Sequence, residues 1–271
     1  MQDLYSLLLR INSPKALRSN FFPLLSWYLV LCTLYLIPSC KKDAPAPDLG
    51  YGYAPINVGH WVIYQIDSTA EDDQTVGRKT YQFQIKEVIE SIFTDNQGRP
   101  TMRLERYRKN YDSLVPYSQQ QWTGPRVYYA NLTSSTYERV EENFRYTRMI
   151  FPVKLGDARW NANAGNVLDA WTGKYTAVDQ PGTVNNLSFD SVASVQEENN
   201  INLVTTVYAE AKYAKHVGLI YRQLLLLNKQ PDSQLDSIPF HDTLGFPSSS
   251  NYSLLSDKAI LYTQQIVSWG N

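Results

Sequence analysis

Apolar and polar residues alternate with a period of two along most of the chain after residue 60. The segments 81–86, 201–207, 217–222 and 260–267 show this alternation and are rich in Tyr, Phe, Val, Ile and Thr. A period of two is typical of strands with two different faces, and β-branched and aromatic residues favour strands. No long segment has the period of an amphipathic helix. The pattern predicts a mostly β fold: an antiparallel curved sheet, arranged as a half-barrel or a sandwich, with few helices.

Residues typical of turns separate these segments. Clusters of Gly, Pro, Asn and Asp at 95–98, 123–125, 180–182 and 198–200 predict four turns. The region 228–256 contains three prolines and a run of three serines. It is predicted to be a long loop before a last strand.

Two stretches of the chain resemble each other. An aromatic residue and a proline precede a glycine and then a tryptophan over 53–61, and the same order recurs over 151–160. We expect each tryptophan to begin a strand. Two organisations remain open: a single β-rich domain over 51–271, or two similar halves near 51–148 and 149–271.

The first 39 residues have the three parts of an export signal. Residues 1–20 carry three basic residues and one acidic residue, residues 21–37 are mostly apolar, and the small Ser39 precedes Cys40. Basic residues stay on the cytoplasmic side while the apolar stretch enters the bilayer, and a small residue lets a peptidase approach the bond. We predict a signal peptide over 1–39, cleaved between Ser39 and Cys40. The alternative is an uncleaved helix, for which residues 21–37 are marginally long.

The segment Ile37-Pro38-Ser39-Cys40 resembles the lipobox of Gram-negative bacterial lipoproteins. The resemblance implies that Cys40 becomes the first residue of the mature chain and carries several acyl chains, which together give stable anchoring. Residues 40–50 would then be the lipidated cysteine and a flexible Pro/Ala tether. The implied partner is the membrane. The implied location is the cell envelope, as an outer-membrane lipoprotein facing the periplasm, with exposure at the cell surface as the alternative.

Charge and cysteine content narrow the function classes. After cleavage the chain keeps 22 of its 25 basic and 25 of its 26 acidic residues, a net charge of −3. Without a basic tract to neutralise phosphates, we expect no nucleic-acid partner. The two cysteines are Cys32, in the leader, and Cys40. The mature domain therefore has no disulfide and no cysteine metal site.

Motifs for catalysis or metal binding are missing from the sequence. The histidines His60, His216 and His241 have no metal-ligand spacing, and no nucleophile elbow or phosphate-binding loop occurs. His60 is expected on the surface or in a turn. The acidic runs at 71–73 and 141–142 are expected to be solvated turns. We predict no enzymatic activity, no cofactor and no metal.

Aromatic residues are the one chemical excess, with 20 Tyr, 9 Phe and 6 Trp. Exposed, they could stack on sugars or peptides, and in a groove they could line an apolar pocket. Buried, they would be the core of a sheet protein. The candidate ligand-binding residues are Trp122, Tyr128, Tyr129, Trp171 and Tyr175.

A second resemblance covers most of the mature chain. Gly59-x-Trp61-x-x-Tyr64, Phe151-Pro152-x₃-Gly156 and the segment 213–221 are similar to a pattern in uncharacterised bacterial lipoproteins. Some of these resemble lipoprotein-localisation factors, whose curved half-barrel surrounds an apolar cavity plugged by helices. No segment here is a candidate for such a plug.

These observations predict a lipid-anchored cell-envelope protein with a non-enzymatic binding or structural role. One alternative is a carrier of lipid or another apolar ligand in a β cavity. Another is a surface module that binds sugar or peptide. The identity of a protein or small-molecule partner stays open.

Overall fold

The computed structural model describes residues 46–72, 75–202, 205–228 and 258–271. Within these ranges, Asp48–Asn271 belongs to one compact unit. The leader, Ser39 and Cys40, His241, Asp73 of the acidic run at 71–73 and nearly all of the loop over 228–256 lie outside the described residues. What the sequence predicts for these residues stays a prediction.

The unit is a single antiparallel sheet of 12 strands with two short 3₁₀ helices. The elements are η1 (Tyr51–Tyr53), β1 (Trp61–Asp72), β2 (Thr75–Thr94), β3 (Pro100–Asn110), η2 (Tyr117–Gln119), β4 (Thr123–Leu132), β5 (Thr136–Glu141), β6 (Phe144–Ile150), β7 (Trp160–Asn161), β8 (Thr172–Val184), β9 (Leu187–Ile201), β10 (Thr205–Ala214), β11 (Gly218–Asn228) and β12 (Lys258–Gly270). This confirms the predicted mostly β, antiparallel fold class.

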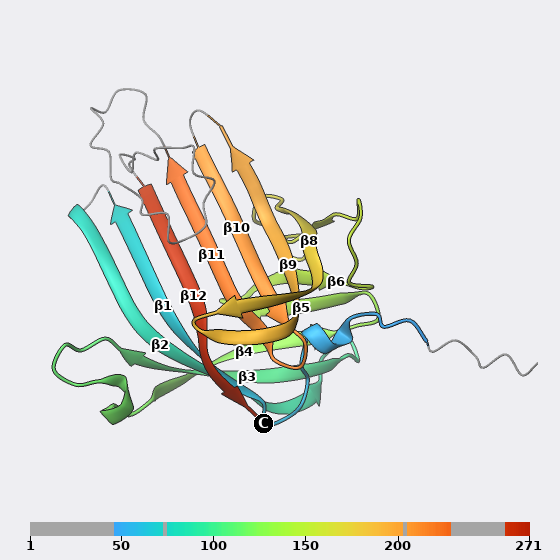
Figure 1. Ribbon diagram of the computed structural model, residues 1–271, viewed down its shortest axis with the longest axis horizontal. Coiled ribbons are helices and arrows are strands. Elements are labelled where there is room, and N and C mark those ends of the chain that lie inside the picture. Colours follow the sequence, from blue (N-terminus) through green and yellow to red (C-terminus); the bar gives the residue numbers. More distant parts are fainter. Residues whose placement is uncertain (1–45, 73–74, 203–204, 229–257) are drawn as a thin grey trace, which may run out of the picture. The chain divides into compact units, whose positions relative to one another are not determined.

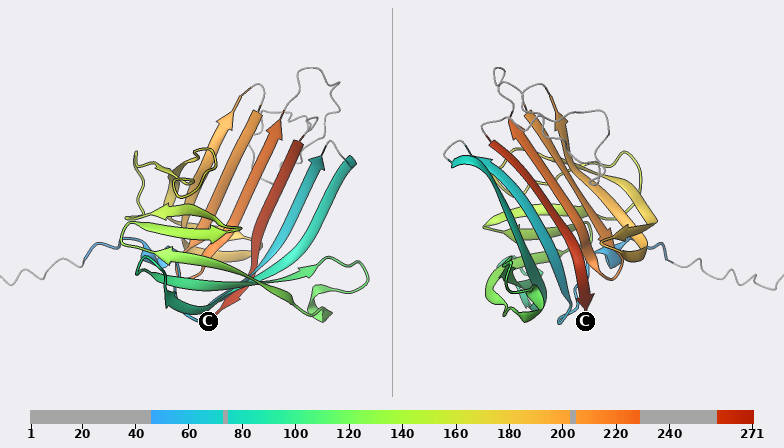
Figure 2. Two further views of the ribbon diagram at one scale, coloured as in Figure 1. Left: turned by 180° about the vertical axis from the view of Figure 1, so that it is seen from behind. Right: turned by 60° about the vertical axis from the view of Figure 1, so that its left-hand side comes forward.

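Strand order is β6-β5-β4-β3-β2-β1-β12-β11-β10-β9-β8-β7. The last strand, β12, therefore lies between β1 and β11, and it joins the beginning of the sheet to its end. The long strand β2 bends, so that β3 to β6 run across β9 to β12 on one side of the sheet (Figures 1 and 2). The sheet thereby curves into a nearly closed barrel.

Contacts between the two ends of the sheet complete the curvature. The Thr147 amide in β6 donates a hydrogen bond to the Ala162 carbonyl, 2.8 Å away, just after β7. The Trp160 indole Nε1–H donates to the Thr147 carbonyl at 3.0 Å. The Tyr175 hydroxyl in β8 donates to the Ile150 carbonyl at 2.7 Å. Polar groups at the edge strands are satisfied in this way.

The inward side chains pack into two main apolar clusters. One cluster surrounds Met102, Met149 and Tyr213, and the other surrounds Ile66 and Ile266. Met149, Ile66 and Ile266 are fully buried. Burying an apolar side chain of this size contributes roughly 1.5–3 kcal/mol. Apolar burial of this kind joins the two sides of the curved sheet.

Turn chemistry differs from the prediction at three of the four sites. The turn at 95–98 is confirmed, since the Gly98 amide donates to the Asp95 carbonyl at 2.9 Å. The residues at 123–125, 180–182 and 198–200 instead lie inside β4, β8 and β9, each beside a register shift. Residues that favour turns there accommodate bulges rather than reversals.

Two hairpin turns are made by residues outside the four predicted turns. Glu142 and Asn143 connect β5 to β6, and Asn185 and Asn186 connect β8 to β9. All four have positive φ, between 47° and 69°. Two-residue hairpin turns of this handedness match the twist of the strands, and Asn tolerates the left-handed region.

The first described residues are fixed to the barrel. The Val153 amide donates to the Leu49 carbonyl at 2.9 Å. The Lys215 ammonium lies 3.0 Å from Asp48 and 2.6 Å from Asp179. The end of the predicted tether, at Asp48 and Leu49, therefore joins the barrel at a defined place.

Candidate functional site

A partly enclosed cavity lies inside the barrel, between β2, β3 and β5 on one side and β11 and β12 on the other. Its volume is about 80 Å³. Roughly 10–15 Å³ by the same measure is enough for one water molecule, so this cavity has room for a small molecule of a few heavy atoms. Its charged lining residues are Glu87, Arg106, Arg139, Glu141, Arg148 and Arg222.

The strand period places these charges on the inner face. In β2, Glu87 lies between Ile85 and Ile89, both buried, two residues to either side. Alternate residues of a strand share a face, so the Glu87 carboxylate points into the barrel with its apolar neighbours. Arg106 in β3 is the direct cross-strand partner of Glu87 and shares that face.

Glu87 accepts hydrogen bonds from two arginines. The Arg139 Nη1 and Nη2 atoms lie 2.7 and 2.6 Å from its two carboxylate oxygens. The Arg106 Nη2 atom lies 2.8 Å from Oε2. Burial on its own would raise the pKa of the Glu87 carboxyl, but these guanidinium groups outweigh it and lower the pKa to about 2.

A second carboxylate, Glu197, lies at a bulge in β9, where no residue of β10 is paired with it. Arg148 in β6 likewise lies at a bulge and has no paired residue in β5. Bulges redirect side chains, and here both point inward: Arg148 and Glu197 are buried and their Nη1 and Oε1 atoms lie 3.0 Å apart. Arg222 in β11 donates to the other oxygen, with Nη2 at 3.0 Å.

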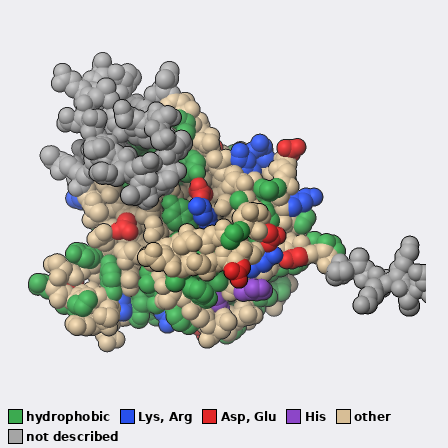
Figure 3. Space-filling view, in the orientation of Figure 1, with side chains coloured by type: hydrophobic (Ala, Val, Ile, Leu, Met, Phe, Trp, Pro, Cys, Tyr) green, Lys and Arg blue, Asp and Glu red, His purple; other side chains and the backbone are tan. Residues whose placement is uncertain are grey.

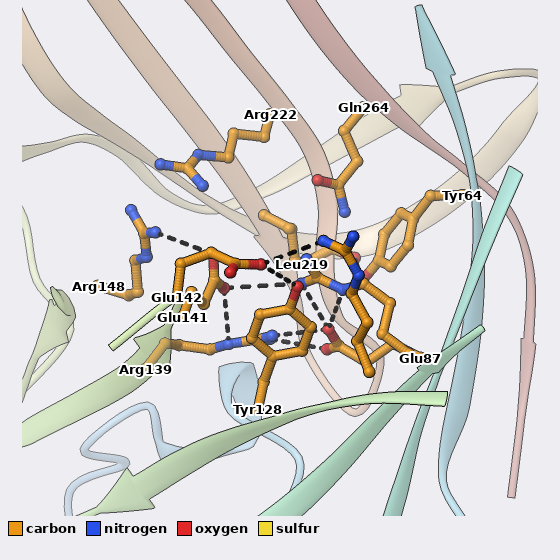
Figure 4. A network of polar contacts seen from close by, with 12 residues as sticks. Tyr64, Glu87, Tyr128, Arg139, Glu141, Glu142, Arg148, Leu219, Arg222 and Gln264 are labelled. Carbon is orange, nitrogen blue, oxygen red and sulfur yellow. Dashed lines mark hydrogen bonds and ion pairs between the residues drawn. The ribbon is translucent and has the colours of Figure 1, made fainter. Parts of the chain in front are cut away.

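Glu141 lies between the ion pairs of Glu87 and the ion pairs of Glu197. Its carboxylate lies 3.1 Å from Arg139 Nε, 3.6 Å from Arg148 Nη2 and 3.7 Å from Arg106 Nη2. Figure 4 shows Glu141 between Arg139 and Arg148, with Arg222 and Gln264 reaching in from the opposite strands. Burial opposes ionisation of Glu141 and Glu197, but the surrounding guanidinium groups lower the pKa of both carboxyls. We call these seven residues the charged cluster: Glu87, Arg106, Arg139, Glu141, Arg148, Glu197 and Arg222.

The charged cluster has more positive than negative charge. Four guanidinium groups face three carboxylates, which leaves a net charge of +1. Burial would lower the pKa of Arg106 and Arg222, but the neighbouring carboxylates raise it above the ordinary arginine value. The three carboxylates and the guanidinium groups of Arg106, Arg139 and Arg222 are therefore charged at neutral pH. On the molecular face in Figure 3, by contrast, acidic and basic side chains are interspersed.

The five aromatic residues predicted from the sequence as ligand-binding occupy different surroundings. Tyr128 and Tyr175 are buried in the same apolar cluster. Trp122 is half-buried, with the Lys109 ammonium 4.4 Å from its ring centre. Tyr129 is 37 % exposed and packs edge-on against Phe93, and Trp171 is half-buried.

Tyr128 and Tyr129 also line a shallow surface hollow together with Arg126 and Glu142. Tyr128 donates its hydroxyl hydrogen to Glu142 at 2.8 Å. The role of the five aromatic residues in ligand binding stays a prediction.

Two other expectations are corrected in part. His60 ends a turn, as expected, since its amide donates to the Asn57 carbonyl at 3.1 Å, but the residue is 3 % exposed and does not lie on the surface. Its ring nitrogens lie 2.8 Å from Asn271 Oδ1 and 3.0 Å from the Val217 carbonyl oxygen. In the acidic pair, Glu142 is exposed in the hairpin turn, but Glu141 points into the charged cluster.

The charged cluster was not predicted from the sequence. A usable signal was present: Glu87, Arg139 and Glu141 fall on the same alternate positions as the buried residues Ile85, Ile89 and Tyr137. A charged residue in the apolar phase of a strand is expected to need a buried partner. Arg148 and Glu197 were harder to find, because a bulge shifts the phase of the alternation.

Comparisons of the chain with protein families, with curated proteins and with solved structures found no match. In the part of the chain that the structure describes, no helix has the length and apolar character needed to cross a membrane. Within the same ranges, no three His, Cys, Asp or Glu side chains gather as ligands for a metal ion.

Proposed function

We propose that this is a lipid-anchored protein of the cell envelope that binds a small polar molecule in the cavity of its barrel and catalyses no reaction. The observation that carries the binding role is the cavity itself, about 80 Å³ and lined by every residue of the charged cluster except Glu197. Small-molecule sites are typically concave, with a few convergent polar groups that fix the orientation of the ligand.

The charged lining favours a polar occupant over an apolar one. Burying an apolar group against guanidinium and carboxylate groups would remove their hydration and give no hydrogen bond in return. A lipid chain is therefore a poorer fit to this cavity than a small polar molecule, and the volume supports the same choice.

The electrostatics support binding rather than catalysis. General acid and base groups work best when their pKa lies near the working pH. The pKa of Glu87 is about 2, and the arginine neighbours lower the pKa of Glu141 and Glu197 too. These carboxylates are held as charged partners and are poor proton donors or acceptors at neutral pH.

The binding role can be tested with the full chain in detergent. Three small probes of different charge are acetate, acetamide and methylammonium. The proposal predicts that at least one raises the melting temperature, Tm, in a saturable way. Leu219→Phe, which adds bulk to a lining residue, should abolish the shift.

The matched control is Leu114→Phe, the same exchange at a side chain that is 88 % exposed. It should leave the shift intact. If none of the three probes shifts Tm in the unaltered protein, or if the shift survives in Leu219→Phe, the proposed binding role is wrong.

The anchoring role rests on Cys40 and is tested separately. Cys40→Ala should prevent acylation and release the mature domain, since several acyl chains are needed for stable attachment. The readout is fractionation of cells combined with intact mass. A Cys40→Ala product that stays in the membrane with residues 1–39 attached would indicate an uncleaved helix instead.

A further inference from the structure

We infer that the molecule bound in the barrel is a small carboxylate, held by Arg222, Tyr213 and Gln264. This inference rests on the binding role proposed above and names the chemical class of the ligand. Three features of the cavity carry it: the charge balance, the unused hydrogen-bond donors and the size.

The charge balance calls for one negative charge. The charged cluster has a net charge of +1 inside a largely buried space, where an uncompensated charge is costly. Water in the cavity would leave this charge in place. A monovalent anion would neutralise it, whereas a cation would add a second positive charge to the same space.

Each of the unused polar groups facing the cavity can donate a hydrogen bond. Among the described residues, Arg222 donates through Nε and Nη2 to Glu197, and its Nη1 has no partner. Tyr213, 4 % exposed, lines the cavity, and its hydroxyl has no hydrogen-bond partner within the described ranges.

Gln264 supplies a third donor. It is the direct cross-strand partner of Arg222, so both side chains lie on the inner face (Figure 4). The Tyr262 hydroxyl donates to Gln264 Oε1 at 2.9 Å, which fixes the amide orientation and leaves Nε2 as the free end. A carboxylate is an acceptor at both oxygens and matches a set of donors.

The size of the cavity limits the anion. A volume of about 80 Å³ suits a molecule such as acetate or a similarly short carboxylate. The first experiment compares the Tm of the full chain in acetate, acetamide and methylammonium at fixed pH and ionic strength. At a concentration of about five times Kd, acetate should raise Tm by about 2–4 °C, and the neutral and cationic probes should not.

A substitution can place the carboxylate in the cavity permanently. Gln264→Glu keeps the shape of the side chain and its hydrogen bond from the Tyr262 hydroxyl, and it adds one negative charge beside Arg222. We expect a higher Tm than that of the unaltered protein, and no further rise with acetate.

Gln223→Glu is the matched control. Gln223 is equally buried and accepts the Tyr221 hydroxyl at 2.7 Å in the same two-residue arrangement. Its cross-strand partner is Glu210 rather than an arginine. The added charge should therefore lower Tm at this position.

The outcomes separate the inference from the proposed function. If acetamide or methylammonium binds and acetate does not, the binding role stands and the carboxylate inference is wrong. If Gln264→Glu lowers Tm as much as Gln223→Glu does, the positive excess of the cavity is not available to an anion, and the inference is wrong again. If no probe binds, both fail.

Discussion

Arg148 in β6 and Glu197 in β9 form a buried ion pair across the two ends of the sheet, with 3.0 Å between Nη1 and Oε1. Both residues occupy bulges, and both point inward because the bulge reverses their phase in the strand. The pair connects two strands that are nine places apart in the sheet order, β6-β5-β4-β3-β2-β1-β12-β11-β10-β9. It therefore helps to close the barrel.

Glu197→Gln should destabilise the protein strongly. The change removes the carboxylate that Arg148 and Arg222 share, and it leaves buried guanidinium charge without compensation. Removing one partner of a buried pair typically costs about 3–5 kcal/mol. The free energy of unfolding in urea measures the loss.

Glu90→Gln is the control for this change. Glu90 pairs with Arg103 on the exposed side of the sheet, and its side chain is 44 % exposed. The urea midpoint should stay unchanged there. Equal losses for Glu90→Gln and Glu197→Gln would contradict a special contribution of the buried pair.

Acid should weaken the fold through Glu87. The pKa of this carboxyl is about 2 in the folded protein against 4.5 for an ordinary glutamate. The unfolded chain therefore takes up the proton first as the pH falls. The contribution of Glu87 is fully present above about pH 4.5 and is lost as the pH falls through about 2.

The size of this effect follows from the pKa difference. A shift of this size corresponds to about 3 kcal/mol at neutral pH. Asp95 and Asp179 also have a pKa of about 2, so the unaltered protein includes their contributions. The difference in unfolding free energy between the unaltered protein and Glu87→Gln isolates Glu87: it should be large at pH 7 and shrink toward pH 2. A pH-independent difference would be inconsistent with the cluster as described.

Gly173→Ala should also destabilise the barrel. Gly173 lies directly opposite Trp160, and a Cβ at this position would come within 2.5 Å of the indole ring. The ring also donates to the Thr147 carbonyl and packs against Tyr175, with ring centres 5.1 Å apart, so it cannot move freely. Overpacking of this kind typically costs about 1–3 kcal/mol.

Thermal unfolding of Gly173→Ala checks this prediction against Gly52→Ala. A Cβ at Gly52 would find its nearest neighbour at 3.5 Å, an ordinary contact. A Gly173→Ala protein as stable as Gly52→Ala would mean that Trp160 can leave its position without cost.

The sequence contained most of the fold. Alternation over 81–86, 217–222 and 260–267 correctly indicated β2, β11 and β12, and both Trp61 and Trp160 begin a strand as expected. The two tryptophans even share a structural role: each covers a glycine on the neighbouring strand, Gly270 and Gly173. The period of two and the strand preference of β-branched and aromatic residues were enough to predict the fold class, because both depend only on neighbouring residues in the chain.

Curvature and closure could not be derived in this way. They depend on bulges, such as those at Arg148 and Glu197. Residues that favour turns also occur beside bulges, so their presence alone does not distinguish a bulge from a turn. The charged cluster combines residues from β2, β3, β5, β6, β9 and β11. Its members are far apart in the chain, so their pairing appears only when the strand order is known.

The most direct test of the account is the location of a bound carboxylate. A crystal of the full chain can be soaked in acetate, and a second crystal in acetamide at the same concentration and ionic strength. The account predicts acetate density in the barrel within hydrogen-bond distance of Arg222 Nη1 and the Gln264 amide, and no acetamide there. A cavity that holds only water in both crystals would contradict it.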